Sequence, residues 1–358
     1  MSSSRPPVRT VPTEAADLSV EVAGDEVAAL SASAVAVGTG GPGSGLTGGD
    51  QHAERRADKA FAGLTRGVGI FVVVLVAAIG AFLIAKAVPA LHADKANFLT
   101  ATQFRPDDPG NARFGVAAVA YGSVVTSVLA LVMAVPVAIG VALFTSEYLP
   151  RRLAQPFGAV IDVLAAVPSV VYGLWGLLFL VPRIKDFSLF LEDHVGFIPI
   201  FKTDGAPGKS LFTAGVVLAV MVLPIITAIS REVFLQTPAD SKDAALALGA
   251  TRWEMIRMTV LPYGRPGVVS AVLLGFGRAI GETIAIALVL SSSYVVSGHL
   301  LAAKGSTIAG NIATYYGDAG KVGVGALIAS GLVLFVVTLV VNGAARTILS
   351  RAARRRAA

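Results

Sequence analysis

The sequence contains no cysteine, few charged residues and only four histidines. Without cysteine the chain has no disulfide, thiolate metal site or cysteine nucleophile, and the scattered histidines give no His-x-x-x-His metal pair. Charged residues make up 15% of the chain and hydrophobic residues 54%, whereas ordinary soluble domains are roughly 25% charged. This composition argues against a soluble globular protein and against metal or cysteine chemistry.

The apolar residues gather in long stretches that contain no Asp, Glu, Lys or Arg. A helix needs about 20 apolar residues to cross the hydrocarbon core of a bilayer, and six stretches approach or exceed that length. They are 67–85, 114–146, 163–182, 210–230, 283–303 and 322–345. We therefore predict an all-α fold, a polytopic membrane helix bundle of about six transmembrane helices. The expected helices are 67–89, 115–144, 157–182, 211–231, 266–294 and 322–346.

The two ends of the chain differ from this membrane region. Residues 1–60 are rich in Ser, Gly, Ala and Pro and hold too few large apolar residues for a core, which predicts a disordered tail. The other end, 351–358, is a short basic tail. Lys and Arg are more frequent in the segments that face the cytoplasm if the N-terminus lies there, so both termini are expected to be cytoplasmic. This distribution explains the high isoelectric point without nucleic-acid binding.

A nucleotide site is not expected on this chain. Gly208, Lys209 and Ser210 match the end of a P-loop, but Thr203 stands where that pattern requires glycine. We expect neither a catalytic residue nor a cofactor.

One loop, about 236–262, carries a local helix signal. Thr237 is expected to cap a short helix, Pro238 fits its first turn, and Gly249 fits the left-handed position after its end. The small side chains at 243–245 would let the groove of another protein approach the backbone closely. An amphipathic loop at the lipid surface is an equal alternative on these grounds.

The same loop resembles the Glu-Ala-Ala loop of ABC importer permeases. It reads Asp-Ala-Ala at 243–245, glycine after three more residues, and Thr-x-Leu-Pro at 259–262, with Asp replacing the usual Glu and Thr the usual Ile. In that family the loop is a coupling helix that fits a cleft of the cytoplasmic ATPase. The resemblance assigns contact with the ATPase to Asp243, Ala244, Ala245 and Gly249.

Two further segments narrow the resemblance. Val-Pro-Ser-Val-Val-Tyr-Gly-Leu-Trp-Gly at 167–176 and Gly-Arg-Ala-Ile-Gly-Glu-Thr at 277–283 are similar to the membrane subunits of the phosphate-specific importer, and Ile-Ala-Ile at 284–286 favours the PstC type. The similarity covers about 65–350. It implies a bacterial plasma membrane location, a second permease subunit of the PstA type, cytoplasmic ATPase subunits that hydrolyse ATP, and an extracytoplasmic phosphate-binding protein. We expect Arg278, Glu282 and Thr283 to bind the substrate.

Arg278 has a physical argument of its own. It lies 13 residues after Arg265, about 20 Å along a helix, which places it near the middle of the bilayer. An arginine there costs about 2.5 to 3.5 kcal/mol, so such residues usually face a bundle interior or an aqueous path. Glu282, four residues later, is expected on the same helix face as a partial neutraliser. One interpretation is a salt bridge that serves insertion alone. We favour a transit contact, because the planar guanidinium suits phosphate oxygens.

The sequence therefore favours a permease subunit of an ATP-driven ABC importer for inorganic phosphate, working by alternating access. The alternative is a self-sufficient ion-coupled anion transporter or channel, which would transport without an ATPase. A membrane enzyme would require a nucleophile with its base or a metal cluster, and the pair Arg278 and Glu282 is neither.

Overall fold

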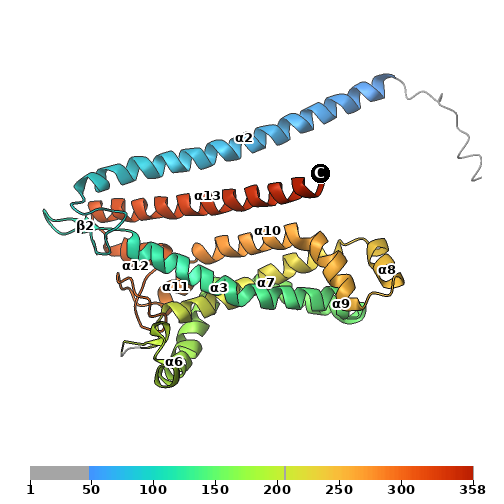
Figure 1. The fold of residues 1–358 in the computed structure, drawn as a ribbon. Helices are drawn as coiled ribbons and strands as arrows, with labels where there is room; N and C mark the ends of the chain where they lie inside the picture. The colour runs from blue at the N-terminus through green and yellow to red at the C-terminus, as the bar shows by residue number, and fades with distance from the viewer. Residues whose placement is uncertain (1–47, 205–206, 358) are drawn as a thin grey trace, which may run out of the picture. The chain divides into compact units, whose positions relative to one another are not determined.

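The computed structural model describes residues 48–204 and 207–357, which are almost entirely helical (Figure 1). The helices are α2 (Gly48–Ala93), α3 (Ala117–Leu143), α4 (Arg151–Ala165), α5 (Ser169–Trp175), α6 (Val181–Val195), α7 (Leu211–Leu235), α8 (Ala239–Ala247), α9 (Arg252–Met255), α10 (Leu261–Ile280), α11 (Ile284–Val289), α12 (Ile308–Tyr315) and α13 (Lys321–Ala357). Short π-helical turns follow α3, α5 and α9, at Phe144–Tyr148, Gly176–Leu180 and Ile256–Val260. Single 3-10 turns lie at Pro199–Phe201 and Tyr316–Asp318. The strands β1 (Phe104–Arg105) and β2 (Arg113–Phe114) form one antiparallel hairpin.

The chain divides into two units, Met1–Leu75 and Val76–Ala358, at a boundary inside α2. In the N-terminal unit the described residues belong to α2, which begins at Gly48 and so includes the end of the predicted tail. Residues 50–62 contain neither glycine nor proline and are rich in Ala, Glu, Arg and Lys, which are strong helix formers. The predicted tail is therefore helical from residue 48. Its first 47 residues lie outside the described part of the chain.

Four helical segments within the described residues are long and apolar enough to cross a membrane. They are Phe61–Ala93, Ala117–Tyr148, Leu211–Leu235 and Lys321–Thr347. A bent pair, Arg152–Ala165 with Ser169–Val195, raises the number to five if it counts as one span. These segments coincide with five of the six predicted helices.

The bent pair corresponds to the span predicted over 157–182. Its two arms meet at 85°. Pro168 lies at the bend with an extended backbone (ψ 138°) and begins α5. Proline cannot donate a backbone hydrogen bond and disfavours helix in the residue before it, which explains why α4 ends just before.

The fifth predicted helix, 266–294, is divided. α10 ends at Ile280, Gly281 follows as its cap, and α11 begins only at Ile284. The prediction of one continuous helix is therefore wrong. It followed the apolar pattern, which continues through the break, but Gly281 lowers the stability of a helix at that point. Residues 290–307 form no further helix.

The core of the C-terminal unit lies where α3, α7 and α10 run beside one another (Figure 1). α3 presents a fully buried alanine once in every four residues, at Ala130, Ala134, Ala138 and Ala142. The first three belong to one apolar cluster with Val217, Leu218, Met221 and Val222 of α7. Small side chains on one face allow two helix backbones to approach closely, which is how membrane helices pack without a hydrophobic driving force.

At the N-terminal end of α3, polar side chains hold the connecting segments together. Asp204 accepts hydrogen bonds from Lys304 Nζ at 2.7 Å and lies 3.0 Å from His299 Nδ1. A backbone bridge between Pro207 and Ala302 adjoins this cluster. These contacts, led by Lys304, hold the pKa of the Asp204 carboxyl at about 2, below its ordinary value. The segments before α7 and before α12 are thereby fastened to each other.

Candidate functional site

The loop predicted to couple to an ATPase contains a short helix, α8. Pro238 precedes its first residue with an extended backbone, and Gly249 follows its end with a φ of 86°, the left-handed value expected for a glycine there. The predicted cap by Thr237 is wrong. Its hydroxyl is buried and has no hydrogen-bond partner among the described residues, because Pro238 occupies the N-cap position.

The predicted coupling residues face in two directions. Asp243, Ala244 and Gly249 are exposed, whereas Ala245 is half-buried. Ala245 packs against the buried cluster of Ala142, Leu143, Phe234, Met255, Ile256 and Val260. Its small side chain therefore seats α8 on this chain, and the residues left free for a partner are its neighbours.

The exposed face of this loop also carries apolar side chains, which were not predicted from the sequence. Leu248, in the last turn before Gly249, is 90% exposed, and Leu246 and Trp253 are also exposed. Helix periodicity would place residue 248 on the same side as the half-buried residue 245, so the sequence contained no signal for this exposure. Leu248 is exposed because it is the C-cap, where the helix ends. The exposed face of this loop therefore presents both apolar side chains and the charged Asp243.

A second short helix, α9, fixes the direction in which the loop returns. The Thr251 hydroxyl accepts a hydrogen bond from the Glu254 backbone, and the Glu254 carboxylate accepts one from the Thr251 backbone at 2.8 Å. This capping box lowers the pKa of Glu254, chiefly through the backbone hydrogen bond. The helix then runs through Ile256–Val260 into α10 without interruption.

Arg278 occupies the last turn of α10 and opens into a cavity of about 600 Å³. The cavity is lined by Ile225 of α7, by Ser270, Leu273, Leu274, Gly277 and Arg278 of α10, and by Asn342 and Arg346 of α13. None of these lining residues is acidic, and two are arginines. The side chain of Arg278 is exposed and forms no ion pair with any carboxylate among residues that the structure describes.

The expected pairing of Glu282 with Arg278 is absent from this part of the chain. Because α10 ends at Ile280, Glu282 is not one helical turn above Arg278 on a continuous face. Its carboxylate accepts a hydrogen bond from the backbone N–H of Ala285 at 3.2 Å instead. The Thr283 hydroxyl donates to the carbonyl of Gly281 at 3.2 Å. Both side chains therefore stabilise the break between α10 and α11.

The structure brings the two sequence segments at 167–176 and 277–286 together. A side chain at Gly173 would lie 2.7 Å from the Cα atom of Ala285, so α5 and α11 touch backbone to backbone. Gly176 is similarly close to the Val289 side chain. The close approach of α11 thus explains why glycine occurs at positions 173 and 176.

No group of three or more His, Cys, Asp or Glu side chains that could hold a metal ion occurs among the described residues. The cavity at Arg278 offers cationic and amide groups, which suit an anion.

A model of the protein family described as "Binding-protein-dependent transport system inner membrane component" matches residues 134–354. The chain belongs to this family. The match includes the loop at 236–262, both motifs and the residues that line the cavity at Arg278.

Curated relatives agree with that assignment. The phosphate transport system permease protein PstC 2 of Mycobacterium tuberculosis is 46% identical over 303 residues, covering 84% of this chain and 94% of that protein. PstC of Xylella fastidiosa is 40% identical over 312 residues, covering 86% of this chain and 95% of that protein. The probable PstC of Methanocaldococcus jannaschii is 38% identical over 248 residues, covering 68% of this chain and 78% of that protein. This permease is therefore a multi-pass membrane protein of the PstC type.

Proposed function

We propose that this chain is the transmembrane permease subunit of an ATP-driven ABC importer for inorganic phosphate. The curated relatives are phosphate transport system permeases and align with most of the chain. Phosphate passes from an extracytoplasmic binding protein, through a path between this chain and a second homologous subunit, to the cytoplasm. ATP hydrolysis on separate subunits drives the change between outward-facing and inward-facing states.

The observation that carries this proposal is the unpaired Arg278 in a cavity without acidic lining residues. A charge held in a membrane protein without a neutralising partner is costly, and such residues mark ion paths. The planar guanidinium can donate two parallel hydrogen bonds to the oxygens of a phosphate. Arg346 adds a second positive charge to the same cavity. A phosphate ion would thus find its negative charge compensated at this depth.

Glu282 and Thr283 act next to that contact. By stabilising the break after Gly281 they fix where α10 ends and which way Arg278 points. The Glu282 carboxylate also limits the local positive potential, so that phosphate is released after each passage rather than retained.

The exposed face of α8 is the docking surface for the ATPase. Asp243, Ala244 and Leu248 face outward, and a short helix that presents small and apolar side chains fits a groove in another protein. This assignment places α8 and both termini in the cytoplasm and the Asp204 cluster on the opposite side of the bacterial plasma membrane, near the phosphate-binding protein. Hydrolysis of ATP belongs to the partner.

Reconstitution into lipid vesicles tests this function. We expect vesicles that contain this chain, the second permease subunit and the ATPase subunits to take up phosphate when ATP and the phosphate-binding protein are supplied. Omitting either the ATPase or ATP should abolish uptake. Equal phosphate uptake by the chain alone would contradict the proposal and favour a self-sufficient transporter. Uptake of another anion in place of phosphate would refute the substrate assignment.

A further inference from the structure

α8 is attached to the permease by more than its two connecting segments. Lys242, in the middle of α8, forms an ion pair with Glu147, and Lys242 Nζ lies 2.7 Å from Glu147 Oε1. The two residues are 95 positions apart in the sequence. Only 19% of the lysine side chain and 6% of the glutamate side chain are exposed. Exposed ion pairs contribute little, whereas a pair shielded from water depends strongly on having both partners in place.

Glu147 belongs to the end of α3, in the π-helical turn Phe144–Tyr148. Such turns are rare and are often found at functional sites in helices. The hydroxyl of Thr145 in this turn donates back to the carbonyl of Val141 at 2.8 Å, which holds the turn to the helix before it. The carboxylate that meets α8 is therefore fixed to α3 and follows any movement of that helix.

A second contact lies beside the first. The guanidinium of Arg252, at the start of α9, is 5.4 Å from the centre of the Tyr148 ring, a cation–π distance. Ala245 of α8 packs against the cluster that contains Ala142 and Leu143 of α3. The loop that carries α8 and α9 thus contacts the last turns of α3 through charge, ring and apolar groups.

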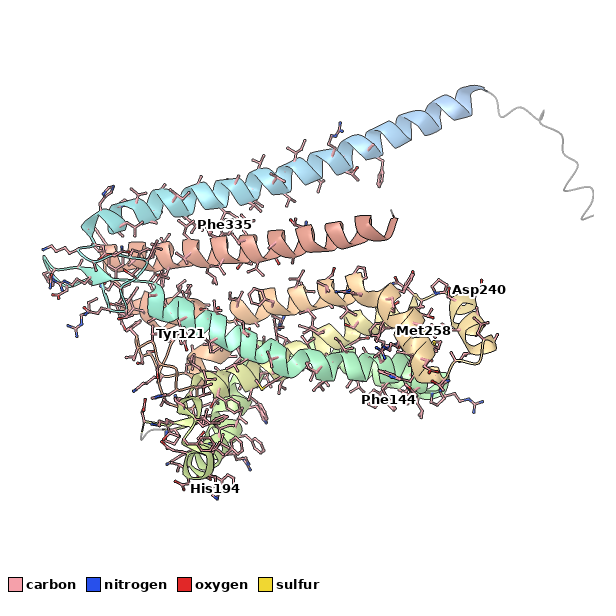
Figure 2. The ribbon with its side chains drawn as sticks, viewed as in Figure 1. Tyr121, Phe144, His194, Asp240, Met258 and Phe335 are labelled. Carbon is pink, nitrogen blue, oxygen red and sulfur yellow. The ribbon has the colours of Figure 1, made fainter. Side chains whose placement is uncertain are left out.

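α3 extends from this contact to the other end of the bundle. Near its start the Tyr121 hydroxyl donates to the Ser297 carbonyl at 3.0 Å, and Ser123 Oγ accepts from the Ile308 backbone at 2.9 Å. Figure 2 shows Tyr121 near one end of α3, and Phe144 near the other end, where Asp240 marks α8. One helix therefore touches both the loop proposed to face the ATPase and, on the far side, the segment 291–307 and the first residue of α12.

We propose that the Lys242–Glu147 ion pair is a coupling link, which transmits the displacement of α8 to α3 and through α3 to the opposite face. This inference rests on the proposed contact of α8 with the ATPase. α7 and α10 are joined to the loop directly by the chain and move with it. α3 is separated from the loop in the sequence by α4, α5, α6 and α7. The ion pair gives α3 a direct, directional attachment, so that three helices move when the ATPase moves one.

The test uses the complete reconstituted importer and measures phosphate uptake and ATP hydrolysis in the same vesicles. We expect Lys242→Met and Glu147→Gln each to lower the phosphate transported per ATP hydrolysed by about five- to tenfold, the lower part of the usual range for coupling between sites. The charge exchange Lys242→Glu with Glu147→Lys should restore most of that ratio. Glu232→Gln, which removes an exposed carboxylate from α7 outside the docking surface, should leave it unchanged.

Each outcome either supports or overturns the coupling role of the ion pair. A ratio unchanged in both single variants overturns the proposal, and so does a charge-exchange variant that assembles but is no better than the single variants. If the single variants fail to assemble, recovery of assembly and ratio in the charge exchange supports the link, and no recovery refutes it. Failure of the proposed function looks different, because the unmodified complex would then show no ATP-dependent phosphate uptake or would not retain the ATPase.

Discussion

The two ends of α10 are built in opposite ways. At its start the helix continues from α9 through Ile256–Val260, where Ile256 and Val260 are fully buried beside Phe234. At its end it stops at Ile280 and leaves Arg278 exposed to a cavity. A helix that is continuous and well packed at one end can transmit a displacement, and a break at the other end can change direction in response. α10 therefore joins the loop proposed to contact the ATPase to the cavity proposed to bind the anion.

The largest effect is expected from closing the gap between α5 and α11. A side chain at Gly173 would lie 2.7 Å from the Ala285 Cα atom, so Gly173→Val forces two backbones apart. Overpacking of this kind costs about 1 to 3 kcal/mol or more. We expect phosphate uptake to fall below a tenth of the level of the unmodified importer, and the amount of assembled complex to decrease. Gly140→Ala is the control, since no atom lies within 4 Å of its added methyl group. Normal uptake by Gly173→Val would show that this contact is not required.

The next effect concerns the shape of the cation at the break. Arg278→Lys keeps the positive charge and loses the planar fork, so we expect uptake to fall about tenfold in a fully assembled complex. Because no ion pair joins Arg278 to Glu282 in the described part of the chain, this substitution leaves no stranded carboxylate. Uptake is measured at equal membrane abundance. Unaltered uptake would indicate that charge alone is needed there.

A smaller effect is expected at the other end of α10, in the coupling loop. Gly249 has a φ of 86°, and no atom lies within 4 Å of an added Cβ. Gly249→Ala therefore adds backbone strain without a clash, about 1 kcal/mol. We expect weaker retention of the ATPase, by about fivefold, with normal membrane insertion. Gly277→Ala, at a glycine with equal free space and a φ outside the left-handed region, should retain the ATPase normally.

The smallest effect should come from the Asp204 cluster, which lies at neither end of α10. Lys304 and then His299 lower the pKa of Asp204 from 3.8 to about 2. A lowered carboxyl pKa means that the cluster contributes its full stabilisation above about pH 4 and loses it as the pH falls toward 2. The protection of backbone amides at residues 300–304 against hydrogen exchange, measured relative to their intrinsic rate at each pH, should fall in that range. Asp204→Asn should already exchange faster at neutral pH, and an identical profile for both proteins would contradict the assignment.

The coupling loop was more predictable from the sequence than the anion site, for a physical reason. α8 is governed by local rules, and Gly249 lies where those rules place it, although Pro238 occupies the N-cap position instead of the first turn. The segment after the break at Ile280 packs on α5, because Gly173 admits α11 at backbone distance. Apolar pattern cannot report a contact between residues more than a hundred positions apart. Because of that break, Glu282 does not pair with Arg278 as predicted. Its carboxylate accepts a hydrogen bond from the Ala285 backbone instead.

The membrane helices show the same division. Uncharged length located the spans formed by α2, α3, α7 and α13, since the bilayer sets that length directly. The bend at Pro168 is a local effect of proline, which disfavours helix in the residue before it. The link between Lys242 and Glu147 could not be predicted, because it joins residues of two separate helices whose spatial relation only the packing of α3 against α7 establishes.

The central claim is that one region couples to the ATPase and another handles phosphate. The direct measurement compares Leu248→Asp with Arg278→Gln in the reconstituted importer, recording ATPase retention and phosphate uptake for each. Leu248 is 90% exposed on the coupling loop, so its replacement by a charged residue should release the ATPase and abolish uptake as a consequence. Arg278→Gln should retain the ATPase fully and lose uptake. If both variants lose the ATPase to the same extent, or if Arg278→Gln transports phosphate normally, the division is contradicted.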